Sequence, residues 1–545
     1  MFLTPRGPES PSPLNGERVG VRGENGRQSL NLAQVTPPGF VARWAVVAAA
    51  ILLQVSSPGR AADLPVAIDS RHQLFLDDYL IASQNGVKRT VEQVRKFPGN
   101  PVLWPTENWE PPKAIVYGTI LRDEGKFKMW YLSGAGIGYA ESDDGIRWHK
   151  PRLSLTLING EQSNILFTRK SETKGPEAFP YFHELFGVHR DDRDPDPARR
   201  YKMGFLDIDW NYNGPDGLPW RKNQRRGLGV AGSPDGLHWK LLDNWATSAI
   251  VDGGTHWMFD PTRQKYVLYG RTLKAAPEVV TAWQTNDWFK QWFSGRAVAR
   301  VESSDFLRWD FTKPDTAPVV MQADLQDKPG TEIYSMRVFL YEGLYVGLLQ
   351  VFHATPAECT LDVQLAVSRD GLHFTRVGDR SPFLSVGPIG SWDRFNLSLA
   401  NNDPIAVGDE LRFYYSGRLY RHAPYAGQDK GEEKSGIGFA SIQRDRFVAL
   451  EASFDGGEIV TKPVILLGHT LRLNAKSDFG QIVVEVLDAD EKLLARSKPL
   501  VQDGLDIPVQ WVDRFEFPKS PVKLRIKLRN ARLFALWCSR VSLSP

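Results

Sequence analysis

The sequence predicts an all-β protein in which a five-bladed β-propeller is followed by a C-terminal β-sandwich. The first observation behind this prediction is a motif in which a serine is followed six residues later by an aromatic residue. Its copies are SDDGIRW from Ser142, SPDGLHW from Ser233, SSDFLRW from Ser303, SRDGLHF from Ser368 and SIQRDRF from Ser441. Recurrence of one motif along the 545-residue chain indicates one structural unit repeated with loops of different length.

The second observation is that each copy has the same surroundings. Short runs of alternating apolar residues precede the motif, such as 137–141 (IGYAE) and 437–440 (IGFA), and this alternation is typical of strands. Asp-Gly favours a tight turn, because glycine accepts a positive φ. Earlier still comes an aromatic-rich strand, such as 127–131 (FKMWY) or 411–415 (LRFYY). With a fourth apolar stretch the unit is a four-stranded meander, and five copies favour a propeller over unrelated hairpins.

The ends of the chain have a different composition. Residues 44–55 are an apolar run, and a small-residue stretch ends at Ala62, which predicts a secretory signal cleaved near that residue. A retained N-terminal anchor is the alternative. We expect residues 1–62 to be a disordered extension plus this signal, and the mature protein to be secreted or periplasmic.

The repeated motif and its surrounding strand pattern end near residue 456, and we predict the domain boundary there. Alternating strands at roughly ten-residue spacing follow and indicate a sandwich over 456–545. The propeller is predicted over 63–455. Its first segment, 66–95, is expected to help close the ring, because a propeller must protect its edge strands.

The composition excludes several classes of function. The formal charge is +3 with both signs interspersed, so no nucleic-acid partner is expected. Cys359 and Cys538 fall in different predicted domains and are expected to be buried thiols without metal-ligand spacing. We expect no cofactor, while a structural cation on the propeller axis and the oligomeric state stay open. No membrane partner is expected after signal cleavage.

Chemistry in a propeller is expected where the chain enters the innermost strand of each blade. These strands line one axis, so polar residues that are distant in sequence converge there. Each such segment carries at least one carboxylate, and the segments are 107–120, 176–190, 251–260, 324–339 and 391–404.

The repeated S-x-D-G-x-x-W signature, the strand order and the trailing sandwich resemble the five-bladed propeller glycoside hydrolases of families 32, 43, 62, 68 and 117. The resemblance extends from Asp63 to about Ser453 for the propeller. It implies a base or nucleophile in the first blade, an aspartate in a middle blade that tunes a pKa, and a glutamate acid in a later blade. The first-blade motifs of families 32 and 43 are absent, and Glu107 and Glu110 of ENWEPP stand there instead.

By position, the resemblance implies Glu110 as the base, Asp252 as the middle-blade aspartate and Glu332 as the acid, with Asp393 of the fifth blade as a rival. Structural roles are the alternatives: a rim salt bridge for Glu110, turn capping for Asp252 and a solvent-facing strand position for Glu332. The candidate substrate-binding residues are His183, His256, Tyr334, Arg418 and His422 for polar contacts, and Trp109, Trp257 and Trp392 for stacking on sugars.

The resulting expectation is a glycosidase that acts on a poly- or oligosaccharide with carboxylate acid/base catalysis. The long insertion at 211–226 indicates a partly walled pocket and therefore exo action. A catalytically inactive propeller that binds glycans or proteins is the alternative.

Overall fold

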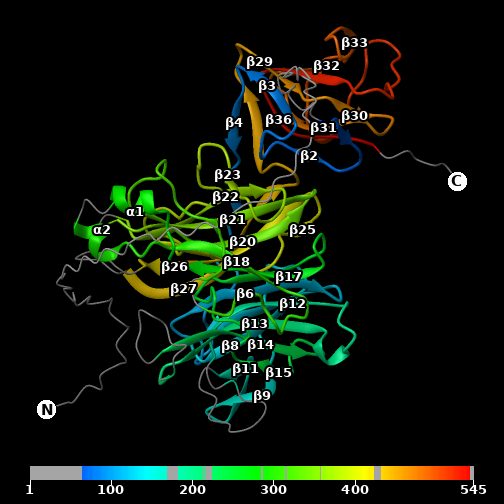
Figure 1. The fold of residues 1–545 in the computed structure, drawn as a ribbon. Coiled ribbons are helices and arrows are strands. Elements are labelled where there is room, and N and C mark those ends of the chain that lie inside the picture. The colour runs from blue at the N-terminus through cyan, green and yellow to red at the C-terminus, as the bar shows by residue number, and fades with distance from the viewer. Residues whose placement is uncertain are drawn as a thin grey trace, which may run out of the picture. The chain divides into compact units, whose positions relative to one another are not determined.

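The computed structural model describes residues 64–168, 179, 182–212, 214, 224–283, 287–313, 316–355, 358–422 and 431–539. The predicted extension and signal, and most of the 211–226 insertion, lie outside these ranges. The described chain is almost entirely β (Figure 1), which confirms the predicted all-β class. Its helical elements are the 3₁₀ turn η1 (Pro197–Arg199) and the short helices α1 (Pro277–Trp283) and α2 (Asp287–Trp292). No helix in these ranges is long and apolar enough to cross a membrane.

Three four-stranded antiparallel sheets come first in the chain, and we call them groups 1 to 3. Group 1 contains β6 (Ala114–Asp123), β7 (Lys126–Ser133), β8 (Gly136–Ser142) and β11 (Ile165–Thr168), with the hairpin β9 (Leu153–Ile158) and β10 (Glu161–Ser163) beside it. Group 2 contains β12 (Phe182–Arg190), β13 (Tyr201–Asp209), β14 (Arg225–Ser233) and β15 (Lys240–Asp243). Group 3 contains β16 (His256–Asp260), β17 (Lys265–Thr272), β18 (Ala297–Ser303) and β19 (Val319–Met321).

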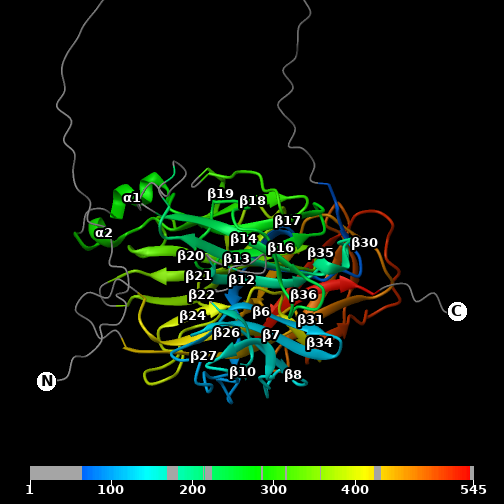
Figure 2. The same cartoon turned by 90° about the horizontal axis from the view of Figure 1, so that it is seen from below.

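Two further groups are joined in one nine-stranded sheet, whose order is visible in Figure 2. Group 4 contains β20 (Thr331–Tyr341), β21 (Leu344–His353), β22 (Thr360–Ser368) and β23 (Thr375–Arg376). Group 5 contains β24 (Asn396–Leu399), β25 (Ile405–Val407), β26 (Glu410–Tyr420), β27 (Gly431–Gln443) and β5 (Arg95–Lys96). A single parallel pairing of β22 with β24 joins the two groups.

The first strands of the five groups lie around one centre. β6 contacts both β12 and β24, β12 contacts β16, β16 contacts β20, and β24 also contacts β21 of group 4. Hydrogen bonds cross between groups here: Asn401 N donates to Gly118 O at 2.7 Å, and His256 Nε2 lies 2.8 Å from Val338 O. The segments expected to converge are therefore brought together.

The repeated motif forms a capped turn. In the first copy, Asp144 Oδ1 accepts from Ile146 N and Arg147 N, both at 2.8 Å, and Ser142 Oγ accepts from Gly145 N at 2.9 Å. The aspartates of the second, third and fourth copies also accept from two backbone N–H groups. The bond from Arg147 N is the main reason that the pKa of Asp144 lies below its ordinary range. These aspartates therefore cap turns.

The motif also links neighbouring groups. A donor on the second strand of one group bonds to the carbonyl of the motif glycine in the next group, and each such bond stabilises the fold by about 1 kcal/mol. The three bonds are Trp130 Nε1 to Gly236 O at 2.7 Å, Tyr269 OH to Gly371 O at 2.9 Å and Tyr414 OH to Gly145 O at 2.8 Å.

The C-terminal strands form two larger sheets that share one hydrophobic core. The first has β34 (Asp503–Pro508), β31 (Leu471–Lys476), β36 (Ala531–Cys538), β28 (Val448–Ala452), β4 (Lys88–Val91) and β2 (Gln73–Leu74). The second has β3 (Ile81–Asn85), β29 (Gly457–Thr461), β35 (Lys523–Arg529), β32 (Gln481–Leu487) and β33 (Leu493–Arg496). β1 (Val66–Ile68) pairs in parallel with β30 (Val464–Leu466).

We expected residues 66–95 to help close the ring, but most strands of this N-terminal segment pair with C-terminal strands. Figure 1 shows the blue strands β2, β3 and β4 among the orange and red C-terminal strands, and β1 to β4 all pair there. Only β5 pairs with the ring, beside β27. The reason is that β28, which follows Phe447 of the fifth motif, leaves group 5 for β4 and β36 and frees the outer position for β5.

Candidate active site

Glu110, the predicted base, lies inside group 1. Its side chain is fully buried, and Oε2 accepts from Lys150 Nζ at 2.6 Å and from two backbone N–H groups. Oε1 bonds to the hydroxyl of Tyr131. Trp109 next to it donates from Nε1 to Asn164 Oδ1 at 2.9 Å. Glu110 therefore has no free oxygen to activate water.

Asp393 occupies the corresponding position in group 5. Its Oδ2 accepts from Lys96 Nζ at 2.6 Å and from Tyr415 OH at 2.9 Å. Tyr415 directly follows the linking residue Tyr414, just as Tyr131 directly follows the linking residue Trp130. Groups 1 and 5 therefore each contain a carboxylate bonded to a lysine and to the tyrosine after the linking residue. Trp392 stacks on Tyr415 with ring centroids 5.4 Å apart. The recurrence indicates a packing role for both carboxylates.

Glu332, the predicted acid, is the second residue of β20 and is fully buried. Its Oε1 accepts from Ser294 N at 2.6 Å and Gly295 N at 2.8 Å, and its Oε2 is ion-paired with Arg296. A general acid must carry a proton that it can donate. Both oxygens of Glu332 are instead occupied by the backbone N–H groups and by Arg296, so the surroundings of Glu332 suit an anchor for the 294–296 segment.

Six side chains gather at the starting ends of the inner strands, and we call them the axial cluster. Its members are Tyr117, Glu184, Asp252, Arg271, Tyr334 and Arg418. The guanidinium carbon of Arg271 lies 3.9 Å from the ring centroid of Tyr334, and that of Arg418 lies 5.2 Å from the ring centroid of Tyr117. Of the four sequence-predicted carboxylates, Asp252 is the one that the fold brings into this cluster.

Asp252 is held ionised by two arginines. Arg226 Nη1 lies 2.8 Å from Oδ1, Arg271 Nη1 lies 3.0 Å from Oδ2, and Gly253 N donates to Oδ1 at 2.7 Å. Burial acts to raise the pKa of Asp252, but the charges of Arg271 and Arg226 outweigh burial and hold that pKa well below its ordinary value. The side chain stays 32% exposed, so it is accessible.

Glu184 is a member of the cluster that the sequence analysis did not single out. Its Oε2 is buried and has no hydrogen-bond partner among the described residues, and its Oε1 lies 4.0 Å from His183 Nε2. Oε2 lies against Gly253, where a Cβ would come within 2.7 Å of it. The side chain is 22% exposed. The segment 176–190 was named as converging, but no motif in it distinguishes Glu184.

Two predicted polar residues border the cluster. His422 Nε2 lies 3.3 Å from the hydroxyl of Tyr334. His183 is 36% exposed and meets Trp210 edge to face. Arg418 Nη2 donates to Ser398 Oγ at 3.4 Å. His183 therefore lies beside Glu184, and His422 lies beside Tyr334.

His256 and Trp257 are buried on the inner strand β16. Burial is the main cause that lowers the pKa of His256 far below its ordinary value, so this imidazole is neutral at pH 7. Trp257 donates from Nε1 to Gly187 O at 3.3 Å and lies against His189. Neither ring is exposed enough to stack on a sugar from the axial cluster.

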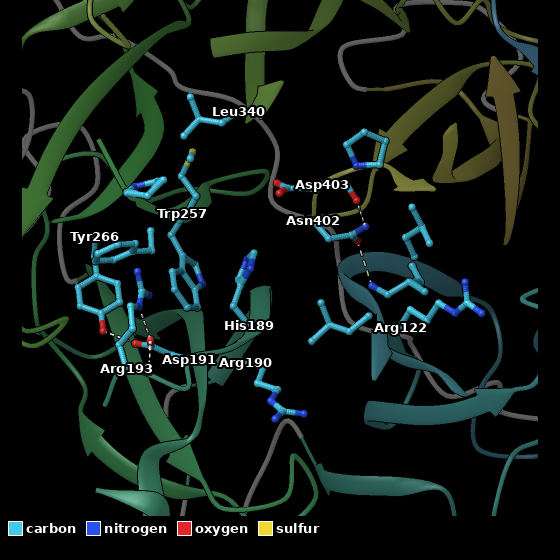
Figure 3. Close-up of a pocket in the computed structure, with 17 residues that line it drawn as sticks. Arg122, His189, Arg190, Asp191, Arg193, Trp257, Tyr266, Leu340, Asn402 and Asp403 are labelled. Carbon is cyan, nitrogen blue, oxygen red and sulfur yellow. Dashed lines mark hydrogen bonds and ion pairs between the residues drawn. The ribbon is translucent and has the colours of Figure 1, made fainter. Parts of the chain in front are cut away.

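A cavity of about 500 Å³ lies at the opposite ends of the inner strands (Figure 3). Among its lining residues are His189, Trp257 and Asp403. The carboxylate of Asp191 is already paired with Arg193 at 2.7 Å and bonded to Tyr266. None of the four predicted carboxylates is among the residues that line this cavity.

No set of three or more His, Cys, Asp or Glu side chains among the described residues is placed to hold a metal ion. Cys359 and Cys538 are both buried and are not joined in a disulfide, in agreement with the expected thiols.

No family model and no curated protein matches the chain. Solved structures that it is similar to include an N-acetylgalactosamine deacetylase from F. plautii, with 15% identity, a TM-score of 0.40 and coverage of 67% of this chain and 97% of that one. A thermostable family-43 glycoside hydrolase has 12% identity, a TM-score of 0.38 and coverage of 63% and 95%. A structure described for the GH130 family of mannoside phosphorylases and hydrolases that target β-1,2 mannosidic linkages in Candida mannan has 15% identity, a TM-score of 0.41 and coverage of 65% and 95%. Glycoside hydrolases are thus among the similar structures.

Proposed function

We propose that this protein is an exported glycoside hydrolase that cleaves glycosidic bonds at the axial cluster. The fold proposed to carry this activity is a five-bladed β-propeller formed by β5 to β27, with a β-sandwich formed by β1 to β4 and β28 to β36. The ring of contacts among β6, β12, β16, β20 and β24 supports five blades. The core shared by the two C-terminal sheets supports the sandwich.

The single observation that carries this function is the contrast between two neighbouring carboxylates. Cleavage needs an ionised carboxylate on one side of the sugar and a protonated acid at the leaving oxygen. Arg226 and Arg271 hold Asp252 ionised. Glu184 has no cationic partner within hydrogen-bonding distance and keeps one oxygen unbonded among the described residues. We therefore assign the acid role to Glu184 in place of Glu332, and the ionised role to Asp252.

Export and exo action belong to the same proposal. The apolar run 44–55 and the small residues ending at Ala62 support export. The length of the insertion at 211–226 supports action on chain ends.

The test compares variants of the two carboxylates on aryl glycosides and on plant and marine oligosaccharides. We expect Glu184→Gln to lower kcat for substrates with poor leaving groups by about 10³-fold, because a general acid contributes 10²–10⁴-fold. Substrates with an activated nitrophenolate leaving group need less protonation and should lose less. Asp252→Asn should impair both classes equally. The exposed carboxylate of Glu161 offers a control, and Glu161→Gln should keep full activity.

Two outcomes would overturn these assignments. Full turnover by Glu184→Gln would remove it as the acid. Loss of turnover in Glu332→Gln with an unchanged thermal midpoint would return the acid role to Glu332. A wild-type protein that binds oligosaccharides without cleaving any of them would instead establish the inactive glycan-binding propeller.

A further inference from the structure

The surroundings of the axial cluster contain more positive than negative charge. Five arginines and three carboxylates lie here, which gives a formal charge of +2 when every carboxylate is ionised. The arginines are Arg226, Arg271, Arg296, Arg337 and Arg418, and the carboxylates are Glu184, Asp252 and Glu332. Arg226 and Arg271 are paired with Asp252, and Arg296 with Glu332. Two buried arginines remain without a carboxylate in hydrogen-bonding contact among the described residues.

Arg418 is the first of these two. It is 9% exposed, and its bond to Ser398 Oγ is long at 3.4 Å. Its Nε is buried and has no partner within the described chain. The guanidinium lies over the ring of Tyr117, from β6 of the neighbouring group 1. An unpaired buried cation is costly, which indicates that a ligand completes this site.

Arg337 is the second. It is 3% exposed and donates from Nη1 to Gly254 O. Its Nε and Nη2 are buried without a partner in the described ranges. Because Gly254 lies against Tyr334, this second positive charge lies beside the axial cluster. It adds a long-range attraction for an anion bound at Arg418.

Arg271 cannot serve as the anchor. Its three donor groups are already taken by Asp252, by Gly253 O at 2.6 Å and by Tyr334 O at 3.3 Å. Arg418 therefore offers the unfilled guanidinium fork. A fork of parallel N–H donors matches the paired oxygens of a carboxylate or a sulfate better than a neutral hydroxyl.

We propose that the axial cluster recognises an acidic sugar and that Arg418 anchors its anionic group, a carboxylate or a sulfate ester. This inference rests on the proposed function and narrows its substrate to uronic acids or sulfated sugars. A site built to bond a polar group strongly rejects analogues that lack it, because its own donors are then left unpaired. We expect acidic sugars to bind at least about 100-fold more tightly than neutral ones that are otherwise identical.

The experiment measures binding separately from turnover. Glu184→Gln protein is titrated by calorimetry with matched pairs: glucuronate and glucose, galacturonate and galactose, and glucose 6-sulfate and glucose. The uronates and the sulfate separate the two sources of the anion. At least one acidic member is expected to bind, and to bind more weakly as NaCl is raised, because salt screens charge.

Variants of Arg418 test the anchor. Arg418→Gln should reduce the preference for the acidic member to near unity, and Arg418→Lys should keep part of it, since the charge remains without the fork. Arg412 of the same strand, which donates to Asp144 O at 2.8 Å, is the matched control. Arg412→Gln should leave the preference unchanged. If Arg418→Gln does not fold, Arg418→Lys and the salt dependence decide.

Two results would overturn this inference. One is equal binding of neutral and acidic members, and the other is failure of every acidic probe to bind. If the protein then hydrolyses neutral glycosides, the proposed function is kept and only the preference for acidic sugars is rejected. Conversely, acidic sugars that bind through Arg418 but are never cleaved would remove the hydrolase function and keep the anion site.

Discussion

At the scale of single residues, Glu110, Glu332 and Asp393 differ from Glu184 in the donors that reach their oxygens. Each of the first three has a cationic side chain within hydrogen-bonding distance, supplied by Lys150, Arg296 or Lys96. Among the described residues, Glu184 has no such cationic partner apart from a histidine nitrogen at 4.0 Å. A carboxylate bonded on both oxygens stabilises the fold, whereas an unbonded one is available to a substrate.

We expect Glu110→Gln to lower the free energy of unfolding by about 3 kcal/mol, because it leaves the buried ammonium of Lys150 without its countercharge. Urea denaturation measures this change. Glu107→Gln is the matched control, since Glu107 pairs with the half-exposed Arg152 and should cost under about 1 kcal/mol. Unchanged stability of Glu110→Gln together with lost hydrolysis would restore Glu110 as the base.

The predicted identity of the site residues depended on information that local sequence does not hold. Lys150 is 40 residues from Glu110, and Lys96 is 297 residues from Asp393. No residue close in sequence to either carboxylate indicates these partners. The converging segments were predictable from the repeat, and one of them contains Asp252. The contrast between Asp252 and Glu184 arises only when Arg226 and Arg271 are placed by tertiary packing.

At the scale of elements, the repeated motif was predictable because its physics is local. Asp144 caps residues two and three positions ahead, and Gly145 adopts a φ of +72°. The third copy departs from this rule, since Phe306 holds a φ of +69° where the first, second and fourth copies have glycine. Its fully buried ring packs 4.5 Å from that of Trp257, and this packing compensates for the backbone strain.

A pair of glycine substitutions separates backbone strain from packing. Gly125 has a φ of +82° with nothing within 4 Å of an added Cβ, so Gly125→Ala should cost about 1 kcal/mol. Gly145→Ala carries the same strain and would also place its Cβ 2.3 Å from Tyr414 Oη, whose hydroxyl bonds Gly145 O. We expect a cost of about 3 kcal/mol or more from thermal unfolding. Equal costs would show that this link between groups contributes no stability.

At the scale of the whole described chain, the unexpected feature is where the N-terminal strands pair. The alternation of apolar residues in 66–95 predicted strands, but such a pattern does not indicate which other strands they pair with. The partners of β3 and β4 lie more than 350 residues further on, in β29 and β28. The outer position of group 5 is filled by β5, only four residues after β4 ends. One short segment therefore takes part in both the ring and the C-terminal sheets.

His72 and Asp445 connect these parts. His72 Nδ1 lies 2.8 Å from Asp445 Oδ2, its ring stacks on Trp537 with centroids 3.9 Å apart, and its backbone N–H donates to Glu342. Tyr341 OH donates to Asp445 Oδ1 at 2.8 Å. The pair thus joins the N-terminal segment, group 4, the end of β27 and β36 at one point. Its protonation should influence how firmly they are held together.

The pH dependence of stability tests this junction. Burial lowers the pKa of His72, but Asp445 raises it more, so the net value lies above the ordinary 6.5; burial raises and His72 lowers the pKa of Asp445, whose net value lies below 3.8. The histidine's contribution is complete below pH 6.5 and is lost as pH rises through its folded pKa. The aspartate's contribution is complete above pH 3.8 and is lost as pH falls through its folded pKa.

The pair should therefore stabilise the fold most between about pH 4 and 6.5. We expect the free energy of unfolding of the wild type to exceed that of His72→Gln by an amount that is largest near pH 6 and shrinks toward pH 9. Urea titrations across this range measure the difference. His238 is 65% exposed and paired only with Asp235 of its own turn, so His238→Gln should show no such trend. A pH-independent difference for His72→Gln would mean that stacking on Trp537, and not charge, holds the N-terminal segment in place.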